Sequence, residues 1–506
     1  MSTPPSVAGS TSTTPPRPTK AKVLIVGAGI GGVVLALLFE RAGISYEIFE
    51  RAKKVVPLGS AISLGPNVMY LFEQLGLAEE IQAHSKDIKD SAQYNDNLEL
   101  IGAHIYSHHN ERYGYAVNII PRSIFYEIVE RRVPREKIHY GTKVLSLMQN
   151  REGVMIRTWD NQTHHGDILV GADGAYSAVR QSLYMQLDKK GVLPPTDKER
   201  LPFTNTCLVG TTNVLEGEKF NFLDREECYF ISVVAKNKPY TWVLFSTRDR
   251  RICWMVVQHL SKKSVKDNDS FRNSEWGPEA ADVMAKEVRD FPLPENMTMG
   301  ELIDLTPKEL ISKVMLEEKL FETWYGGRTV LLGDACHKMH PAAGLGAVSA
   351  IHDAVVLASR LFELPSTELG DLEKAFSAYK GERYPMAVKS YESSKTMAKL
   401  IAQSWINVIV RAVTKHMPLF LWLKVMDSMM SYRPQVTFLP LVPDRGTIKP
   451  TKQISLELAK KFNHAGSDAS SSVTSVTSSS VAPSVASSAV APSVASSAAA
   501  PPATSA

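Results

Sequence analysis

The sequence is poor in cysteine: its 506 residues include only Cys207, Cys228, Cys253 and Cys336, and no CxxC pair. This scarcity excludes a dense disulfide framework and fits a reducing compartment. An excess of one charge is also lacking, because the net charge of +4 is spread thinly along the chain. The sequence therefore gives no reason to expect nucleic acid or another strongly acidic partner.

Long hydrophobic runs are absent as well. Residues 1–20 are rich in Ser, Thr and Pro without an apolar core, so they do not resemble a signal peptide. We therefore expect an intracellular protein, either cytoplasmic or held peripherally on an internal membrane. The most apolar segment, residues 405–426, is interrupted by basic residues and Pro418, which disfavours a spanning helix. Residues 405–430 are interpreted either as an amphipathic segment on a membrane surface or as a helical cap over a substrate pocket.

Large side chains are almost missing from the end of the chain. From about residue 466 the composition is Ser, Ala, Val, Thr and Pro, and the nonapeptide VAPSVASSA occurs at 481–489 and again at 490–498. Such a segment cannot bury enough apolar surface to offset the entropy of ordering it. We predict a disordered tail, and a role as a tether or interaction segment stays open.

What the sequence does contain is a complete dinucleotide fingerprint at residues 22–51. An apolar strand enters a turn with Gly27, Gly29 and Gly32, and an apolar helix and a second strand ending in Glu50 follow. Gly27 permits the turn, Gly29 lets the backbone approach a pyrophosphate, and Gly32 lets the helix pack on the strand. The helix N-terminus offers unpaired N–H groups to phosphates, and Glu50 is placed to accept hydrogen bonds from ribose hydroxyls.

Two further motifs follow. GADGAYSAVR at 171–180 places Asp173 after a short apolar strand, and by itself it is equally typical of a capped strand–helix turn. GDACHKMHPAAGLG at 333–346 places Asp334 where it would face a second polyol. Its glycines would let backbone N–H groups approach a flat heterocycle or a phosphate.

Together and in this order, the three motifs resemble those of the class A single-component flavin monooxygenases, which include the salicylate, p-hydroxybenzoate and kynurenine hydroxylases. The resemblance spans residues 20–390. It implies an α/β fold in which a Rossmann-like FAD-binding domain is interleaved with a mixed β-sheet substrate domain. It also implies non-covalent FAD and NAD(P)H as a transient co-substrate.

The expected organisation combines this resemblance with the pattern of apolar runs. Residues 200–260 carry four strand-like runs but no glycine fingerprint, which favours a substrate-side sheet. A strand at 329–332 and a long helix over 371–400 then return to the αβ pattern. The predicted divisions are a disordered tail (1–20), the first part of the FAD-binding domain (21–195), the substrate domain (196–320), the second part of the FAD-binding domain (321–400), an apolar helical segment (401–465) and a disordered tail (466–506).

A narrower resemblance points to a subgroup. The stretches 58–77, 119–129 and 431–446 look like those of the fungal paxilline-type FAD monooxygenases, and general aromatic hydroxylases lack the last one. That group epoxidises a prenyl-chain alkene of indole-diterpenes and meroterpenoids with O₂, through a flavin C4a-hydroperoxide. The resemblance therefore implies an apolar, prenylated small-molecule substrate of fungal secondary metabolism.

The resemblance also assigns roles to individual cofactor-binding residues. It implies that Glu50 holds the adenosine ribose, that Ala61 lines the flavin through its backbone, and that Arg122 contacts the cofactor from its helix. It also implies that Asp173 lies near the pyrophosphate and the NAD(P)H route, and that Asp334 and Ala347 hold the ribityl chain and the isoalloxazine. Gly346, next to Ala347, would let backbone N–H groups approach a flat heterocycle or a phosphate. Members of the family often have Asn where this chain has Val348, so one side-chain hydrogen bond is lost there.

The chemistry of an alkene shapes the expected catalytic residues. An alkene attacks an electrophilic oxygen directly and needs no base, so the site can be apolar and dry. Tyr240 is the candidate near the substrate, with a buried structural tyrosine as the alternative. His337 and His340 are expected to fix a loop rather than to catalyse, and no metal site is predicted despite their i, i+3 spacing.

Two rival functions stay open at this point. An aromatic phenol hydroxylase would share the fold and the cofactors. A non-catalytic flavin-binding protein would use its C-terminal segment and tail for interactions. A flavin enzyme with two nucleotide domains would need a second glycine fingerprint, and residues 180–325 contain none.

Overall fold

The computed structural model describes residues 21–55, 61–260, 278–401 and 418–460. The described elements up to Ala459 belong to one unit of the chain. Both predicted disordered tails lie outside the described residues, and so do residues 402–417 of the predicted apolar segment.

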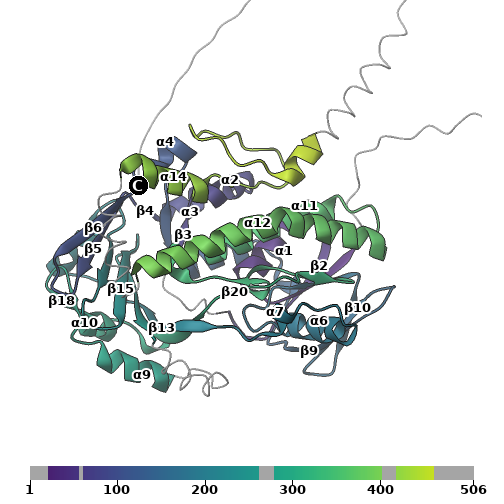
Figure 1. Cartoon of the computed structure of the whole chain (residues 1–506), viewed down its shortest axis with the longest axis horizontal. Helices are drawn as coiled ribbons and strands as arrows, with labels where there is room; N and C mark the ends of the chain where they lie inside the picture. Colours follow the sequence, from purple (N-terminus) through teal and green to yellow (C-terminus); the bar gives the residue numbers. More distant parts are fainter. Residues whose placement is uncertain (1–20, 56–60, 261–277, 402–417, 461–506) are drawn as a thin grey trace, which may run out of the picture. The chain divides into compact units, whose positions relative to one another are not determined.

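The first sheet joins strands from both ends of the folded chain (Figure 1). Its order is β21-β22-β12-β1-β2-β8, and all neighbours are parallel except the edge pair β21–β22. The strands are β1 (Lys22–Val26), β2 (Ser45–Glu50), β8 (Ile138–Tyr140), β12 (Ile168–Gly171), β21 (Tyr325–Gly326) and β22 (Thr329–Leu331). The predicted interleaving is confirmed, because Thr329 of β22 pairs with Leu169 of β12.

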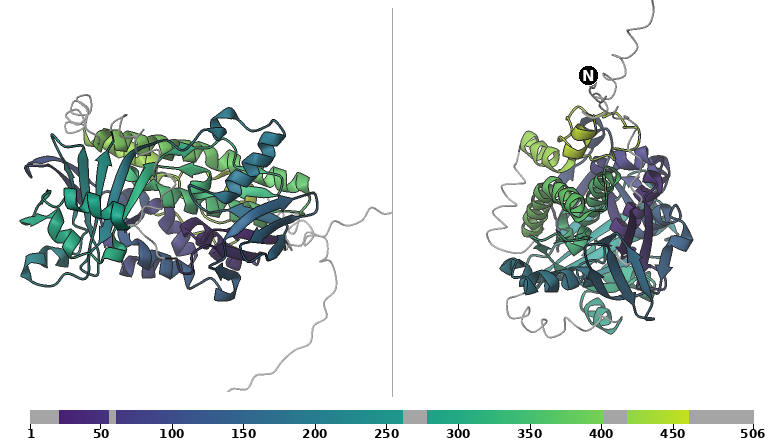
Figure 2. Two further views of the ribbon diagram at one scale, coloured as in Figure 1. Left: turned by 90° about the horizontal axis from the view of Figure 1, so that it is seen from below. Right: turned by 90° about the vertical axis from the view of Figure 1, so that its right-hand side faces the viewer.

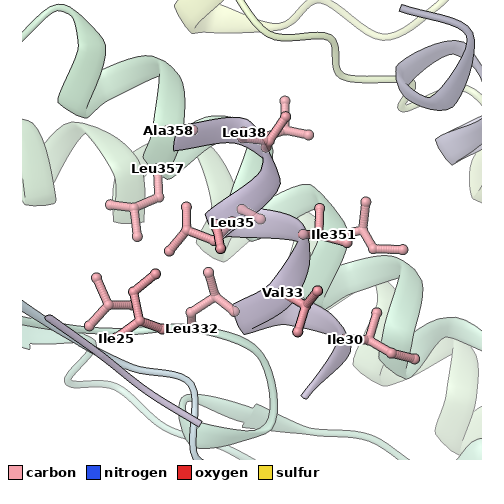
Figure 3. Close-up of a cluster of buried hydrophobic side chains, with 14 of the residues drawn as sticks. Ile25, Ile30, Val33, Leu35, Leu38, Leu332, Ile351, Leu357 and Ala358 are labelled. Carbon is pink, nitrogen blue, oxygen red and sulfur yellow. The ribbon is translucent and has the colours of Figure 1, made fainter. Parts of the chain in front are cut away.

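Three helices build the core beside this sheet. The helix α1 (Ile30–Ala42) is apolar nearly all round and packs on α11 (Leu345–Phe362), which in turn lies along α12 (Leu369–Ile401). Figure 3 shows Val33 and Leu35 of α1 gathered with Leu332 and Ile351. Burial of each such side chain contributes roughly 1.5–3 kcal/mol, which explains why α1 needs no polar face.

One described helix, α11, has the length and composition of a membrane span. However, 83% of that apolar window is buried within the protein. The helix is therefore apolar because it is a core helix, packed between α1 and α12.

The second sheet has seven strands in the order β19-β13-β16-β15-β14-β5-β6, visible together in the left view of Figure 2. They are β5 (Asp90–Asn95), β6 (Leu100–Ile105), β13 (Phe203–Thr211), β14 (Phe230–Val234), β15 (Tyr240–Ser246), β16 (Ile252–His259) and β19 (Ser312–Glu317). The four strands expected between 200 and 260 are all present. However, β5 and β6 come from the stretch assigned to the FAD-binding domain, so a single boundary at residue 195 does not follow the sheets.

The two faces of the seven-stranded sheet have different neighbours. One face, which includes Leu208, Trp242 and Trp254, forms a core with α9 (Pro278–Glu287) and α10 (Met299–Asp304). Alternate residues point to the other face, where Cys207 and Val257 form a smaller cluster. This second face, called the inner face below, is the one whose residues also contact the third motif.

The remaining described helices and strands are smaller. The helices are α2 (Pro66–Gln74), α3 (Ala78–Ala83), α4 (His109–Tyr113), α5 (Arg122–Glu130), α6 (Ala178–Lys189), α7 (Pro195–Lys198) and α14 (Leu419–Met430). The short strands are β3 (Ala61–Leu64), β4 (Lys86–Asp87), β7 (Asn118–Pro121), β9 (Val144–Gln149), β10 (Val154–Thr158), β11 (Thr163–Gly166), β17 (Pro292–Leu293), β18 (Met297–Thr298), β20 (Lys319–Leu320) and β23 (His337–Lys338).

Residues 431–455, here called the C-terminal strap, return to the first part of the chain. Arg433 is buried, donates to the carbonyl of Tyr113 at 3.2 Å and pairs with Asp444. The side-chain amide of Gln74 donates to the carbonyl of Val436 at 3.0 Å. The stretch 431–446, which distinguishes the narrower subgroup, is thus anchored on the folded body.

Candidate functional site

The glycine turn after β1 leaves no room for side chains at two of its three glycines. Gly27 has φ +103°, and a Cβ there would lie 2.4 Å from the carbonyl oxygen of Ala172. A Cβ on Gly32 would lie 2.1 Å from the carbonyl oxygen of Gly27. By contrast, nothing lies within 4 Å of the position that a Cβ on Gly29 would take. The turn is therefore closed on the protein side and open at Gly29.

The start of α1 has the features of an anion cradle. Gly29 is its N-cap and supplies no side-chain hydrogen bond. The carboxylate of Glu50 lies at the same turn, accepting from the N–H groups of Ala28 at 2.9 Å and Ala52 at 2.8 Å. Uncapped helix N–H groups and open space suit a pyrophosphate, with Glu50 next to the position of the adjoining ribose.

The second motif supports this turn through its backbone. The Cα of Asp173 is 2.8 Å from the position of a Cβ on Gly27. The Asp173 carboxylate accepts from the Ser177 hydroxyl at 2.5 Å and from the N–H of Val179 at 3.2 Å, so it supports the start of α6, whose N-cap is Ser177. Burial raises the pKa of Asp173, and these hydrogen bonds oppose the rise. Its backbone, rather than its carboxylate, is therefore the part in contact with the glycine turn.

Arg180 joins the second motif to the third. Its guanidinium donates to the carbonyls of Ala335 at 2.9 Å and Ala175 at 2.6 Å, and it lies over the ring of Phe321 at 4.2 Å. The sequence indicated Arg180 only as part of a helix start. Its linking role depends on a carbonyl 155 residues away, which no local pattern reveals.

The third motif brings three predicted cofactor residues together. Asp334 pairs with Lys338 at 2.6 Å and interacts with the charge of Arg122. Burial alone would raise the pKa of Asp334, but the Lys338 ammonium and Arg122 lower it, so the group is a carboxylate at neutral pH. Ala61 of β3 pairs with Pro121, the residue before Arg122. Ala61, Arg122 and Asp334 thus lie around one region.

Asp353 fixes the turn that carries Asp334. Its carboxylate accepts from the N–H of Gly333 at 2.9 Å, contacts Nε2 of His337 at 2.5 Å and pairs with Nε of Arg383 at 2.8 Å. The side chains of His337, Asp353 and Arg383 are fully buried. His337 therefore has the loop-fixing position that the sequence favoured for it.

Cys336, His337 and Asp353 form a group close enough in space to suggest a metal site. The Arg383 guanidinium already pairs with the carboxylate of this group. Burial raises the pKa of the Cys336 thiol well above its usual value, whereas a metal ligand must be a thiolate. The group is better explained as the support of the third motif.

The start of α11 is a second open helix terminus. Its N-cap Gly344 has φ +65° and supplies no side-chain hydrogen bond, and a Cβ there would lie 2.6 Å from Oγ of Ser63. No atom lies within 4 Å of the position that a Cβ on Gly346 would take. Val348 is buried in the main core, so it packs where the resemblance would place an asparagine. Gly346 and Ala347 therefore lie at a terminus that can receive an electron-rich ring edge.

Tyr240 does not lie with these motifs. It belongs to the core against α9 and α10, where Gln258 donates to its hydroxyl at 2.7 Å and Phe291 packs edge-on at 5.1 Å. The inner face of the sheet carries its neighbour Thr241 instead. This placement matches the alternative of a structural tyrosine, and the prediction of substrate contact at Tyr240 gains no support.

These features define a flavin-dinucleotide-binding protein. The open turn at Gly29, the carboxylates of Glu50 and Asp334, and the second helix terminus at Gly346 are a fitting set for the pyrophosphate, ribose, ribityl chain and ring of FAD. The chain also matches the family model "FAD binding domain" over residues 20–198 and 234–394.

The curated relatives give the activity. The chain is 30% identical to FAD-dependent monooxygenase ptmM of Penicillium ochrochloron over 76% of this chain and 90% of that protein. It is 30% identical to FAD-dependent monooxygenase paxM of Penicillium paxilli over 75% of this chain and 78% of that protein. The chain therefore belongs to the FAD-dependent monooxygenases.

Solved structures agree on the fold. A variant of HpxO of Klebsiella pneumoniae complexed with FAD superposes with a TM-score of 0.65 at 19% identity, over 82% of this chain and 99% of that one. CtdE in complex with FAD and a substrate gives a TM-score of 0.60 at 18% identity, over 75% of this chain and 89% of that one. The predicted α/β fold, FAD as cofactor and the family resemblance are confirmed.

Proposed function

We propose that this monooxygenase uses NAD(P)H and O₂ to epoxidise an alkene in the prenyl chain of an apolar substrate, a meroterpenoid or indole-diterpene intermediate of fungal secondary metabolism. Bound FAD would supply the electrons that activate O₂, so that one oxygen atom reaches the substrate and the other leaves as water. The protein's residues bind the cofactor, orient the substrate and exclude water.

One observation carries this proposal: the third hydrophobic cluster joins the predicted flavin-lining strand to the substrate sheet. It includes Ala61 of β3, Phe230 and Phe245 of the inner face, and Met426 and Met430 of α14. Methionine and phenylalanine present apolar surface that suits a prenyl chain. An alkene attacks an electrophilic oxygen without a base, whereas a phenol hydroxylase gains from a base near the ring hydroxyl.

The decisive experiment compares substrates on purified holoenzyme. With NADPH or NADH and O₂, a prenylated aromatic compound should yield a product heavier by one oxygen atom, with the alkene carbons converted to an epoxide. A simple phenol should be turned over at least tenfold more slowly. Faster turnover of the phenol would establish the aromatic hydroxylase instead. Absence of substrate-stimulated NAD(P)H oxidation with every compound would favour the non-catalytic flavin-binding protein.

We also propose that α14 rests on the surface of an internal membrane, which would suit a water-insoluble substrate. Leu419, Phe420, Leu421 and Val425 are exposed on this helix, and Lys424 beside them is exposed too. A short apolar helix face with a basic residue is typical of interfacial binding. Phe420→Ser combined with Leu421→Ser should weaken co-sedimentation with anionic vesicles, and full retention of vesicle binding would contradict the proposal.

A further inference from the structure

A chain of four buried or half-buried side chains links the third motif to the inner face of the substrate sheet. The Asn205 amide lies 3.2 Å from Nε2 of His340 on one side and 2.8 Å from Nδ1 of His259 on the other. Nε2 of His259 lies 3.1 Å from the hydroxyl of Thr241. These residues, called the cross-sheet chain below, come from the 333–346 loop and from β13, β16 and β15.

The backbone N–H of Ala342 determines the tautomer of His340 and hence the direction of hydrogen bonding along the cross-sheet chain. Nδ1 of His340 accepts from the N–H of Ala342 at 3.2 Å, so the proton of the neutral ring is on Nε2. The Asn205 amide nitrogen faces Nε2 of His340 and the hydroxyl of Thr204, and its oxygen faces Nδ1 of His259. Exchanging the amide oxygen and nitrogen, which occupy equivalent positions, lets the oxygen accept from Nε2–H of His340 and the nitrogen donate to Nδ1 of His259. Nε2–H of His259 then donates to the hydroxyl of Thr241.

The cross-sheet chain meets the 333–346 loop just before the start of α11. His340 is the N-cap of the turn Pro341–Ala343, which leads directly to Gly344 and the start of α11. The far side of this loop is in close approach to Ser63 of β3, as a Cβ on Gly344 would lie 2.6 Å from its Oγ. The loop is thus held between the substrate sheet and the strand that carries the predicted flavin-lining residue Ala61.

The other end of the cross-sheet chain is held by the strands of the seven-stranded sheet. Asn205 and His259 are directly opposite each other in the β13–β16 pair. Thr241 is fully buried, and Asn205 and His340 are 7% and 5% exposed. A buried hydrogen-bonded chain of this kind holds its members in one arrangement, since a buried member without its partner would lose the hydrogen bond and stay desolvated.

We propose that Asn205 and His259 are positioning residues for oxygen transfer: through His340 they hold the 341–344 loop and the start of α11 in register with the inner face that receives the substrate. The inference rests on the FAD-dependent monooxygenase activity and not on which bond is oxidised. Loss of register lets activated oxygen decay to hydrogen peroxide instead of reaching the substrate. The role is therefore read out as coupling, the fraction of oxidised NAD(P)H that appears as oxygenated product.

The test compares variants of the holoenzyme at neighbouring positions of the paired strands β13 and β16. Asn205→Leu and His259→Leu remove the chain, whereas His259→Asn keeps an acceptor at the position of Nδ1. The matched control is Thr206→Val at a buried position on the opposite face of β13, which removes the hydrogen bond from the Thr206 hydroxyl to Gln258 of β16. Measured quantities are FAD content, product formed, hydrogen peroxide formed and the visible circular dichroism of bound flavin.

The two leucine variants should retain FAD, lose coupling at least threefold with a matching rise in hydrogen peroxide, and change the flavin dichroism. His259→Asn should recover most of the coupling, and Thr206→Val should resemble the wild type. Wild-type coupling and dichroism in Asn205→Leu, or equal uncoupling in Thr206→Val, would overturn the inference. If the wild type oxygenates no substrate, the proposed function fails, and the dichroism of the variants still decides this inference.

Discussion

The guanidinium of Arg383 and the carboxylate of Asp353 form an ion pair at 2.8 Å in which both side chains are fully buried. Arg383 comes from α12 and Asp353 from α11, and the carboxylate also holds the N–H of Gly333. The long helix thus supplies the charge that keeps Asp353 ionised beneath the third motif. Burial opposes this ionisation, but the neighbouring His337 and Arg383 lower the pKa of Asp353.

Breaking this pair should be costly. Arg383→Met leaves a buried carboxylate without its partner, so we expect the free energy of unfolding to fall by about 3–5 kcal/mol. Urea denaturation of the FAD-loaded protein measures this change. Asp353→Asn in the Arg383→Met background should restore part of the loss, because it removes the charge and keeps an acceptor for Gly333.

A control pair is available on the surface. Arg289 and Asp304 are 2.6 Å apart, but their side chains are 44% and 62% exposed. Arg289→Met should destabilise the protein far less than Arg383→Met does, since exposed ion pairs contribute little. If Arg289→Met and Arg383→Met lower the free energy of unfolding by similar amounts, burial does not determine how strongly the Asp353–Arg383 pair stabilises the protein.

Two glycines of the first turn should respond differently to the same substitution. Gly27→Ala places a Cβ 2.4 Å from a backbone carbonyl at φ +103°, so we expect the chain to misfold or lose several kcal/mol of stability. Gly29→Ala meets no protein atom within 4 Å, so the apoprotein should keep its stability while FAD binding weakens.

Thermal unfolding with and without added FAD separates these effects. Gly29→Ala should unfold like the wild type without FAD and show a smaller stabilisation by FAD, because ligand stabilisation follows affinity. If Gly29→Ala binds FAD as tightly as the wild type, the pyrophosphate does not lie against this residue.

We predict that Tyr240 takes no part in the chemistry. Tyr240→Phe removes the acceptor for the Gln258 amide in the core against α9 and α10. Stability should fall by about 0.5–1.5 kcal/mol, whereas kcat/KM should change less than twofold. Steady-state kinetics and urea denaturation on the same preparations check both parts, and a loss of kcat larger than tenfold would place Tyr240 at the substrate after all.

Tyr240 also illustrates what the sequence can and cannot predict. Local chemistry was enough for the Gly27 turn, the strand ending in Glu50 and the α6 cap at Ser177, because each depends on residues close in sequence. The strand containing Tyr240 was predicted correctly, but its two faces are both mostly buried, so alternation could not tell which face contacts the third motif.

Pairing between residues that are far apart in the sequence is the second feature that local patterns could not predict. Asn205 and His259 are 54 residues apart and become neighbours only through the register of β13 and β16. The strand β5 carries mostly polar residues, and the apolar side chains of β6 are largely exposed, so neither strand has the buried pattern that would tie it to the substrate sheet. Such pairings depend on how the whole chain closes, and local propensity does not specify them.

Acid should destabilise the protein through His352. This side chain is buried in α11 with Nε2 2.8 Å from the carbonyl of Asn67, and burial together with the nearby Arg383 charge lowers its pKa to about 3. The unfolded chain binds this proton near the ordinary pKa of about 6.5, whereas the folded protein does not. Stability from this group is therefore complete above a pH of about 6.5 and is lost as the pH falls from there toward about 3.

Between a pH of about 7.5 and a pH of about 5 the loss should be about 2 kcal/mol for this group. His352→Gln should flatten the acid side of the stability profile by that amount when the free energy of unfolding is measured at both pH values. His84→Gln, at an exposed position, should leave the profile as it is in the wild type. An unchanged slope in His352→Gln would mean that other groups account for the acid sensitivity.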